Sequence, residues 1–351
     1  MTEVKDSRKA FKIIRNSFAI IVTVGLIAFL IYRFKPKNIA ESIRTLDIWV
    51  IFVAILIMVM MFGIKIIRWL YILRKLDVTI SFFQATQLVL IGAFGASITP
   101  AKIGDVVRAL YLSSWTETEE STSFFSAILD RVTDLISIGI FSLVALPFFI
   151  TLLEEKIKWA IAGGLLIIAI ILLLMFNSQI IRRIVIIISK LKKQKPDSTN
   201  HNNETEIFEA NQKLNSRTLR VLDDYYSHLA YFTPKSYVLI IFLSLLFWIL
   251  LGIQVSLLIV SMANITLNIQ VILTITGIMA LAAIVSLIPI SISGIGVRDA
   301  TITVLVFYSL TISYEVAFGA SIIQTAANML IPALLGGLIL LIRKWKRSSN
   351  K

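Results

Sequence analysis

Long apolar runs alternate with short polar segments along most of the chain. The runs cover about residues 16–34, 49–73, 81–99, 122–150, 157–176, 234–262, 267–288 and 315–342. Most of them reach the roughly 18 to 20 apolar residues that an α-helix needs to cross a bilayer. The pattern predicts an all-α, polytopic membrane protein with about six to eight transmembrane helices.

Two of the runs end in short charged motifs that look like copies of each other. The first motif begins at Pro100 and reads PAKIGDVVR, and the second begins at Pro289 and reads PISISGIGVRD. Helix breakers and charges are costly at membrane depth unless they face a cavity or a protein partner. We therefore predict two re-entrant or broken helical segments, over about 81–112 and 267–311. A matched pair of broken segments is typical of the binding sites of transporters.

Basic residues in the flanks predict a topology with both termini in the cytoplasm. Two hairpins entered from opposite sides would leave three full crossings in each half of a single domain, 1–351. The halves, about 10–150 and 157–345, would then form an inverted repeat. The polar segment 192–216 would be a cytoplasmic loop. Four basic residues in the 33–47 loop disagree with this topology, and an alternative has eight full crossings with two half-helices.

Composition narrows the class of partner. Hydrophobic residues make up 57% of the chain and charged residues only 16%, and the formal net charge is +13. In a membrane protein this charge indicates positive-inside loops and anionic lipid headgroups rather than nucleic acid. The chain has no cysteine and two histidines, so we expect no cofactor and no metal site.

One helical segment carries three charges within a turn and a half: Asp130, Arg131 and Asp134. The two aspartates are one turn apart and share a helix face. Charges at this depth do not face lipid. They either line a hydrophilic cavity or form a buried ion-pair network that joins helices.

The two motifs supply a second set of candidates: Lys102, Asp105, Arg108, Arg298 and Asp299. Arginine suits a phosphate because its planar guanidinium presents several donors. The alternative is that these residues only cap helices and turns at the membrane interface.

The motifs also contain residues that shape the backbone. Glycine allows close backbone approach or positive φ, and proline leaves backbone groups free. The candidate hinge positions are Pro100, Gly104, Pro289, Gly294 and Gly296.

Other polar residues in the apolar runs have simpler interpretations. We expect Lys65 and Arg68 to extend to the inner membrane surface, and Trp69, Trp159 and Trp345 to lie in interfacial belts. Gln324 and Asn328 lie one turn apart, and either line a cavity or bond a neighbouring helix.

These motifs together resemble the lysylphosphatidylglycerol synthase transmembrane-region family of flippase-like membrane proteins. The resemblance covers about residues 10–345. It rests on the order and spacing of Pro100, Gly104, Asp105 and Arg108, then Asp130, Arg131 and Asp134, then Pro289, Gly294, Ile295, Gly296, Arg298 and Asp299. Aspartate stands where glutamate is commoner in the family, which keeps the charge and shortens its reach.

The resemblance implies a protein of the cell membrane that moves a phosphate-containing lipid between leaflets, and not an enzyme. The lipid would be anionic, aminoacylated or glycan-linked. Arg108, Arg131 and Arg298 would hold its headgroup. The carboxylates would position those arginines or hold a cationic headgroup: Asp105, Asp130, Asp134 and Asp299. The chain ends soon after the last apolar run, so we expect it to lack the soluble aminoacyl transferase domain fused to some members. Two alternatives stay open: a non-transporting scaffold for a lipid-modifying enzyme, and a membrane enzyme that uses Asp130 and Asp134 on a lipid phosphate.

Overall fold

The structure is a computed structural model. It describes residues 25, 28–33, 36–99, 103–149, 155–177, 179–180, 223–287 and 291–349. Most of the first apolar run, the polar segment 192–216, and Pro100, Lys102 and Pro289 lie outside the described residues. The principal elements are α2 (Pro36–Arg44), α3 (Ile48–Lys75), α4 (Phe82–Ser97), η1 (Ile103–Val106), α5 (Val107–Thr116), α6 (Glu120–Phe149), α7 (Glu155–Phe176), α10 (Pro234–Ala263), α11 (Ile269–Val285), α12 (Val297–Leu310), α13 (Tyr314–Thr325), η2 (Ala326–Leu330) and α14 (Ile331–Ser349). The prediction of an all-α polytopic membrane protein is confirmed.

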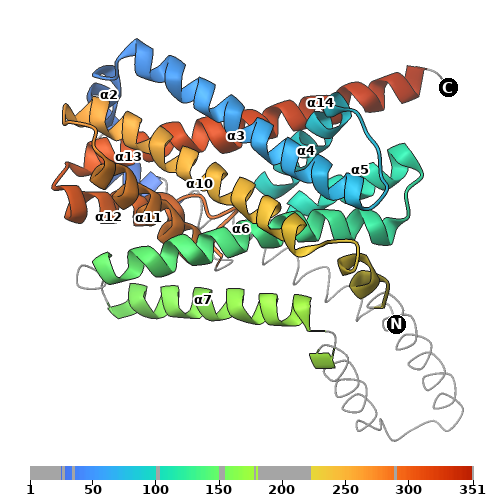
Figure 1. Cartoon of the computed structure of the whole chain (residues 1–351). Coiled ribbons are helices and arrows are strands. Elements are labelled where there is room, and N and C mark those ends of the chain that lie inside the picture. Colours follow the sequence, from blue (N-terminus) through green and yellow to red (C-terminus); the bar gives the residue numbers. More distant parts are fainter. Residues whose placement is uncertain are drawn as a thin grey trace, which may run out of the picture.

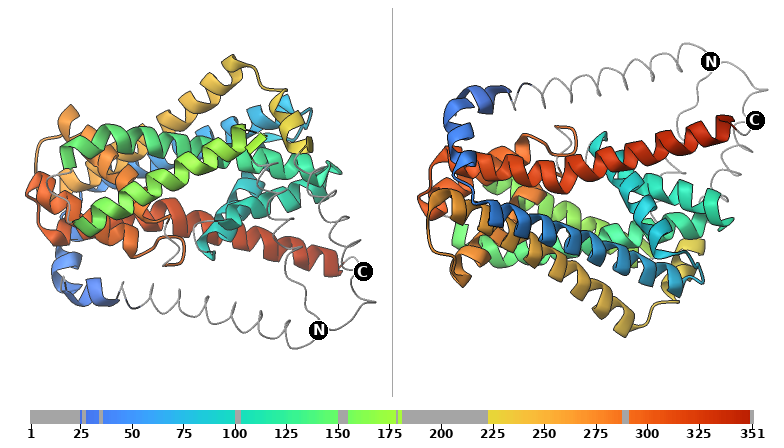
Figure 2. Two further views of the ribbon diagram at one scale, coloured as in Figure 1. Left: turned by 90° about the horizontal axis from the view of Figure 1, so that it is seen from below. Right: turned by 90° about the horizontal axis from the view of Figure 1, so that it is seen from above.

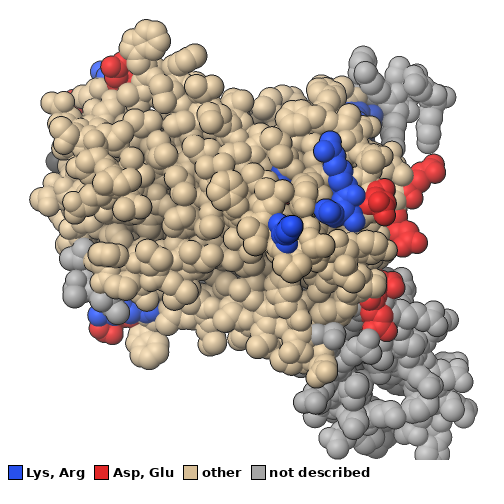
Figure 3. All heavy atoms as spheres, in the orientation of Figure 1, with Lys and Arg blue, Asp and Glu red and all other residues tan. Residues whose placement is uncertain are grey.

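Four helical stretches in the described part are long and apolar enough to cross a membrane: α3, α6, α10 and the continuous stretch from α13 into α14. Two details differ from the sequence prediction. The 33–47 loop contains the short helix α2. The last apolar run includes a π-helical segment, η2, between α13 and α14. On the face shown in Figure 3, charged side chains gather toward the two ends of the bundle, as expected for a protein that crosses a bilayer.

Helices α3 and α10 lie antiparallel along the bundle (Figure 1). At one end, the Tyr71 hydroxyl donates to Ser236 Oγ at 3.1 Å. At the other, the backbone N–H of Asp47 donates to Ser261 Oγ at 3.2 Å. Asp47 also caps α3 by accepting from the N–H of Trp49.

The first motif segment is a helical hairpin made of α4, η1 and α5. The 16 residues of α4 extend about 24 Å, less than the roughly 30 Å of a hydrocarbon core. The chain then turns back, so that Gly95 lies against Gly104 and Gly92 against Asp105. A Cβ on Gly104 would lie 2.0 Å from the carbonyl oxygen of Gly95, so this turn requires glycine.

The second motif segment is a hairpin made of α11 and α12. Its turn has positive φ at Ser293, Gly294 and Gly296. Glycine adopts such a φ without strain, as at the last two positions. Figures 1 and 2 place the two hairpins toward opposite ends of the bundle. The first joins α3 to α6 at the end where α14 finishes, and the second joins α10 to α13 at the other end. This is the arrangement expected of hairpins entered from opposite sides, and the inverted repeat itself stays a prediction.

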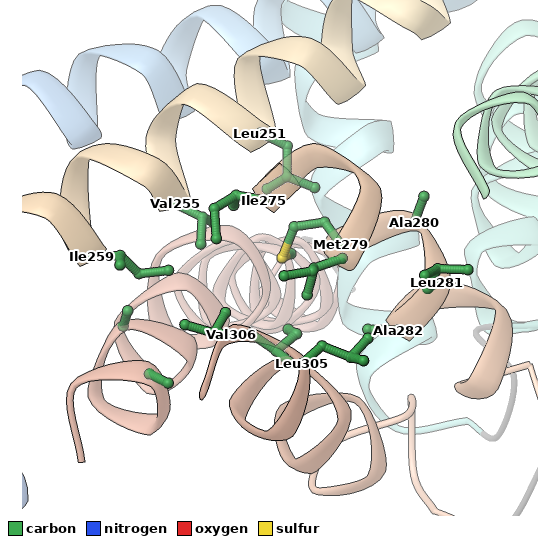
Figure 4. Packing of buried hydrophobic residues seen from close by; sticks show 14 of the residues in the cluster. Leu251, Val255, Ile259, Ile275, Met279, Ala280, Leu281, Ala282, Leu305 and Val306 are labelled. Carbon is green, nitrogen blue, oxygen red and sulfur yellow. The ribbon is translucent and has the colours of Figure 1, made fainter. Parts of the chain in front are cut away.

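A hydrophobic core holds the second hairpin against α10. Leucine, valine and isoleucine side chains of α10 face α11 and α12 (Figure 4). The labelled members of this core are Leu251, Val255, Ile259, Ile275, Met279, Ala280, Leu281, Ala282, Leu305 and Val306. A second core, which includes Leu73, Leu88 and Leu112, packs the first hairpin against α3. Both hairpins are therefore built into the bundle.

Candidate functional site

Seven charged side chains meet where α3, α6 and the first hairpin pack together. We call them the first charged cluster: Lys65, Arg68, Asp105, Arg108, Asp130, Arg131 and Asp134. Helix α3 contributes two of these residues, η1 and α5 contribute one each, and α6 contributes three. The cluster thus joins two long helices to the hairpin.

Asp130 is the centre of the cluster and is fully buried. Its Oδ1 accepts from Arg68 Nε at 2.6 Å, and its Oδ2 accepts from Arg108 Nη2 at 2.5 Å. Arg68 continues to Asp134, whose Oδ1 lies 2.7 Å from Arg68 Nη1. Ser244 of α10 also donates to Asp134 at 3.1 Å. Buried charges persist in a membrane protein when they are paired and hydrogen-bonded in this way.

Arg68 and Trp69 correct two sequence predictions. Arg68 is only 1% exposed, so the expectation that it reaches the membrane surface is wrong. Trp69 is fully buried and donates from Nε1 to Ser126 at 3.3 Å, so it does not lie in an interfacial belt. Its ring lies 4.6 Å from the guanidinium carbon of Arg108, a cation–π contact that supports the buried arginine.

The rim of the cluster is more open than its centre. The side chains of Lys65 and Arg131 are 17% and 27% exposed. Both approach the same atom, Asp105 Oδ2, at 3.6 and 3.7 Å. Arg131 also lies 3.8 Å from Asp134 Oδ2. The cluster has four cations and three carboxylates, so its described residues carry one surplus positive charge near the rim.

The second motif forms a separate, compact cluster of Arg298 and Asp299 with Ser321 and Thr325. Asp299 Oδ1 accepts from Ser321 at 2.6 Å, from Thr325 at 2.9 Å and from Arg298 at 3.4 Å. Its Oδ2 accepts from the N–H of Gly296 at 2.9 Å. We call this the second charged cluster. Its one cation and one anion neutralise each other and hold the turn at the start of α12.

Polar side chains in the middle of the bundle form hydrogen bonds between helices. Asn328 in η2 donates to Gln254 Oε1 at 2.6 Å, and Gln254 donates to the carbonyl of Ala54 at 2.8 Å. Asn328 therefore bonds a neighbouring helix, one of its two predicted roles. Gln324 Oε1 is buried with no hydrogen-bond partner among the described residues.

The structure places the predicted site residues in two separate groups. Asp105, Arg108, Asp130, Arg131 and Asp134 come together as expected. Arg298 and Asp299 lie on α12, which Figure 1 places away from α5, and no ion pair in the described ranges joins the two clusters. Sequence reasoning missed the part played by Lys65 and Arg68. Their spacing of three within an apolar run puts both on one helix face and was the available signal.

Comparison with known proteins identifies the family. The sequence model of the lysylphosphatidylglycerol synthase TM region matches residues 16–336. The chain belongs to the lysylphosphatidylglycerol synthase transmembrane-region family. A UPF0104 membrane protein of Methanocaldococcus jannaschii is 25% identical over 348 residues, covering 97% of this chain and 98% of that protein. A UPF0104 membrane protein of Pyrococcus horikoshii is 24% identical over 136 residues, which are 38% of this chain and 41% of that protein.

The match includes both hairpins and the charged segment of α6. A membrane location for this family member follows from the match together with the long apolar helices.

Proposed function

We propose that this protein binds the phosphate-bearing headgroup of a membrane lipid at the rim of the first charged cluster and carries it between leaflets. The observation that supports this is the surplus positive charge at that rim, within an otherwise apolar bundle. A phosphate brings the missing negative charge, and Arg131 offers it a planar set of donors. The protein would act in the cell membrane with both termini in the cytoplasm.

The two charged clusters would have different roles in this function. Lys65 and Arg131 are partly exposed, and their ion pairs with Asp105 are long, at 3.6 and 3.7 Å, so an anion can compete with that carboxylate for them. Arg298 is buried beside a carboxylate that accepts four hydrogen bonds. We therefore assign headgroup binding to the first cluster. The second would fix the turn of the other hairpin.

The buried centre of the first cluster argues against an enzyme. Both carboxylate oxygens of Asp130 accept hydrogen bonds from arginines. A carboxylate held this way is a poor base or nucleophile, because reaction would break its ion pairs. Asp130 would instead hold Arg68 and Arg108 in place.

A scaffold for a lipid-modifying enzyme is the second candidate. It is favoured by the same buried centre, because a paired network also joins helices in a protein that moves nothing. In that case the rim would need no substrate, and removal of a rim cation would leave lipid movement unchanged.

Reconstitution into liposomes tests the proposal. Movement of headgroup-labelled anionic, aminoacylated and polyprenyl-phosphate lipids is measured for the wild type and for Arg131→Met. We expect movement of at least one of these lipids, reduced about tenfold in the variant by loss of one charge-assisted contact. Arg74→Met is the matched control, since Arg74 is exposed on the last turn of α3. Failure of the folded wild type to move any of these lipids would favour the scaffold.

A further inference from the structure

The aspartates of the two clusters differ in how completely they are bound. Both oxygens of Asp130 and both oxygens of Asp299 accept hydrogen bonds. Among the described residues, Asp105 accepts no hydrogen bond as short as these. Its Oδ2 is 3.6 Å or more from Lys65 and Arg131, and its Oδ1 is buried without a hydrogen-bond partner among the described residues. An unmatched buried carboxylate oxygen is costly. Asp105 is thus held by longer ion pairs, whereas Asp130 and Asp299 accept short hydrogen bonds.

The two cations that form ion pairs with Asp105 Oδ2 come from different long helices. Lys65 lies on α3 and Arg131 on α6, and both point their charge at one oxygen of a third element, η1. Two cations that converge on a single oxygen form a subsite for an anion. In the state described here, a side chain of the protein occupies that subsite.

We propose that Asp105 is an internal stand-in for the phosphate of the substrate. A phosphodiester headgroup would enter between Lys65 and Arg131 by displacing the Asp105 carboxylate. This inference rests on the proposed function and deepens it. A phosphodiester carries one negative charge, as the carboxylate does, so it can take the place of Asp105 between the two cations. Because Asp105 stays in the cluster, the added charge also offsets the surplus positive charge. The subsite therefore selects a monoanionic phosphodiester.

The exchange also links headgroup binding to the first hairpin. Asp105 lies on η1 at the turn of the hairpin, and its ion pairs tie that turn to α3 and α6. When a headgroup takes its place, these two ties are lost, while the contact of Gly95 with Gly104 within the hairpin remains. The turn of the hairpin then has fewer ties to the long helices, while the Arg108–Asp130 ion pair and the core against α3 still hold α4 and α5 in the bundle.

Binding measurements on Asp105→Asn test the inference. The probe is short-chain dihexanoyl phosphatidylglycerol, added to purified protein in a neutral detergent. Removal of the competing charge is expected to tighten binding about tenfold, whereas Lys65→Met is expected to weaken it about tenfold. In Lys65→Met/Asp105→Asn, the gain from the asparagine should shrink. Binding to Asp105→Asn that is equal to or weaker than wild type would overturn the inference.

Two controls separate charge and lipid effects. Glu120→Gln removes one negative charge from an exposed position at the start of α6 and should leave the affinity unchanged, whereas an equal gain there would overturn the inference. Glycerophosphoglycerol, the same headgroup without acyl chains, should bind far more weakly than the lipid. Equal binding would overturn a lipid as the ligand. Thermal unfolding of each variant verifies that it is folded.

The liposome assay distinguishes this inference from the proposed function. Lipid movement by the wild type without tighter binding by Asp105→Asn overturns the stand-in and leaves the function intact. Tighter binding without lipid movement supports the anion subsite and overturns transport. Absence of both binding and movement overturns both.

Discussion

The pairing of individual charges decides what each residue of the first charged cluster can do. Asp130 holds two arginines and is inaccessible, whereas Arg131, its neighbour in sequence, is 27% exposed and loosely paired. The two residues point to different sides of α6, because successive residues of a helix are about 100° apart. Adjacent charges of one motif thus have a structural and a binding role.

The structural role of Asp130 predicts a large loss of stability in Asp130→Asn. The change keeps the size of the side chain but leaves Arg68 and Arg108 with less compensation for their buried charges, which we expect to cost about 3–5 kcal/mol. Thermal unfolding in detergent measures this. The control is Glu155→Gln, which removes the exposed ion pair with Lys158 and should change stability by about 1 kcal/mol or less. Equal effects of the two changes would contradict the assigned role.

At the scale of elements, the sequence around each break predicts the hairpins, but it does not predict which helices contact each other. Proline, glycine and charge at the ends of two apolar runs predicted breaks at the right places. The spacing of Gln324 and Asn328 suits an ordinary helix, so the π-helical segment η2 left no signal in the sequence. There Asn328 bonds Gln254, and Ser293 of the second hairpin contacts Met329 at 3.7 Å. Such π-helical turns are frequent at functional sites.

The close turn of the first hairpin predicts a severe effect of Gly104→Ala. The added Cβ would lie 2.0 Å from the Gly95 carbonyl oxygen, so the backbone must separate and shift Asp105. We expect a lower unfolding temperature and loss of lipid movement in the liposome assay. Gly63→Ala in α3 is the matched control, since its Cβ meets nothing within 4 Å. It should be neutral or stabilising by up to about 1 kcal/mol.

At the scale of the whole molecule, the hairpins lie toward opposite ends of one helical bundle (Figure 2). The first is joined to its neighbours by residues 76–81 and 117–119, and the second by residues 264–268 and 311–313. If each hairpin enters and leaves the membrane on its own side, these two pairs of connections lie on opposite faces of the bilayer.

Single cysteines test this topology, because the chain has none of its own. Glu119 lies in a connection of the first hairpin and Leu267 in a connection of the second, and both residues are exposed. With an impermeant maleimide, Glu119→Cys should react only in inverted vesicles, together with a C-terminal tag, and Leu267→Cys only in intact cells. Reaction of Glu119→Cys from the outside would favour the alternative with eight full crossings.

The sequence by itself determined the features that depend on local composition and periodicity. These are the helical membrane class, the positions of the two breaks, and the shared face of Asp130 and Asp134. Each follows from the cost of exposing backbone or charge to lipid, which acts within one segment.

Only the tertiary structure decided which charges pair. Arg68 lies 62 residues from Asp130 in sequence, and although Lys65 and Arg68 share a helix face, nothing near Arg68 identifies the buried carboxylates with which it pairs. The sequence also could not predict that Trp69 is buried, that Arg298 is separate from Arg108, or that the ion pairs of Asp105 are long. The free energy of a buried charge depends on the partner that packing brings to it, and packing joins residues that are far apart in the chain.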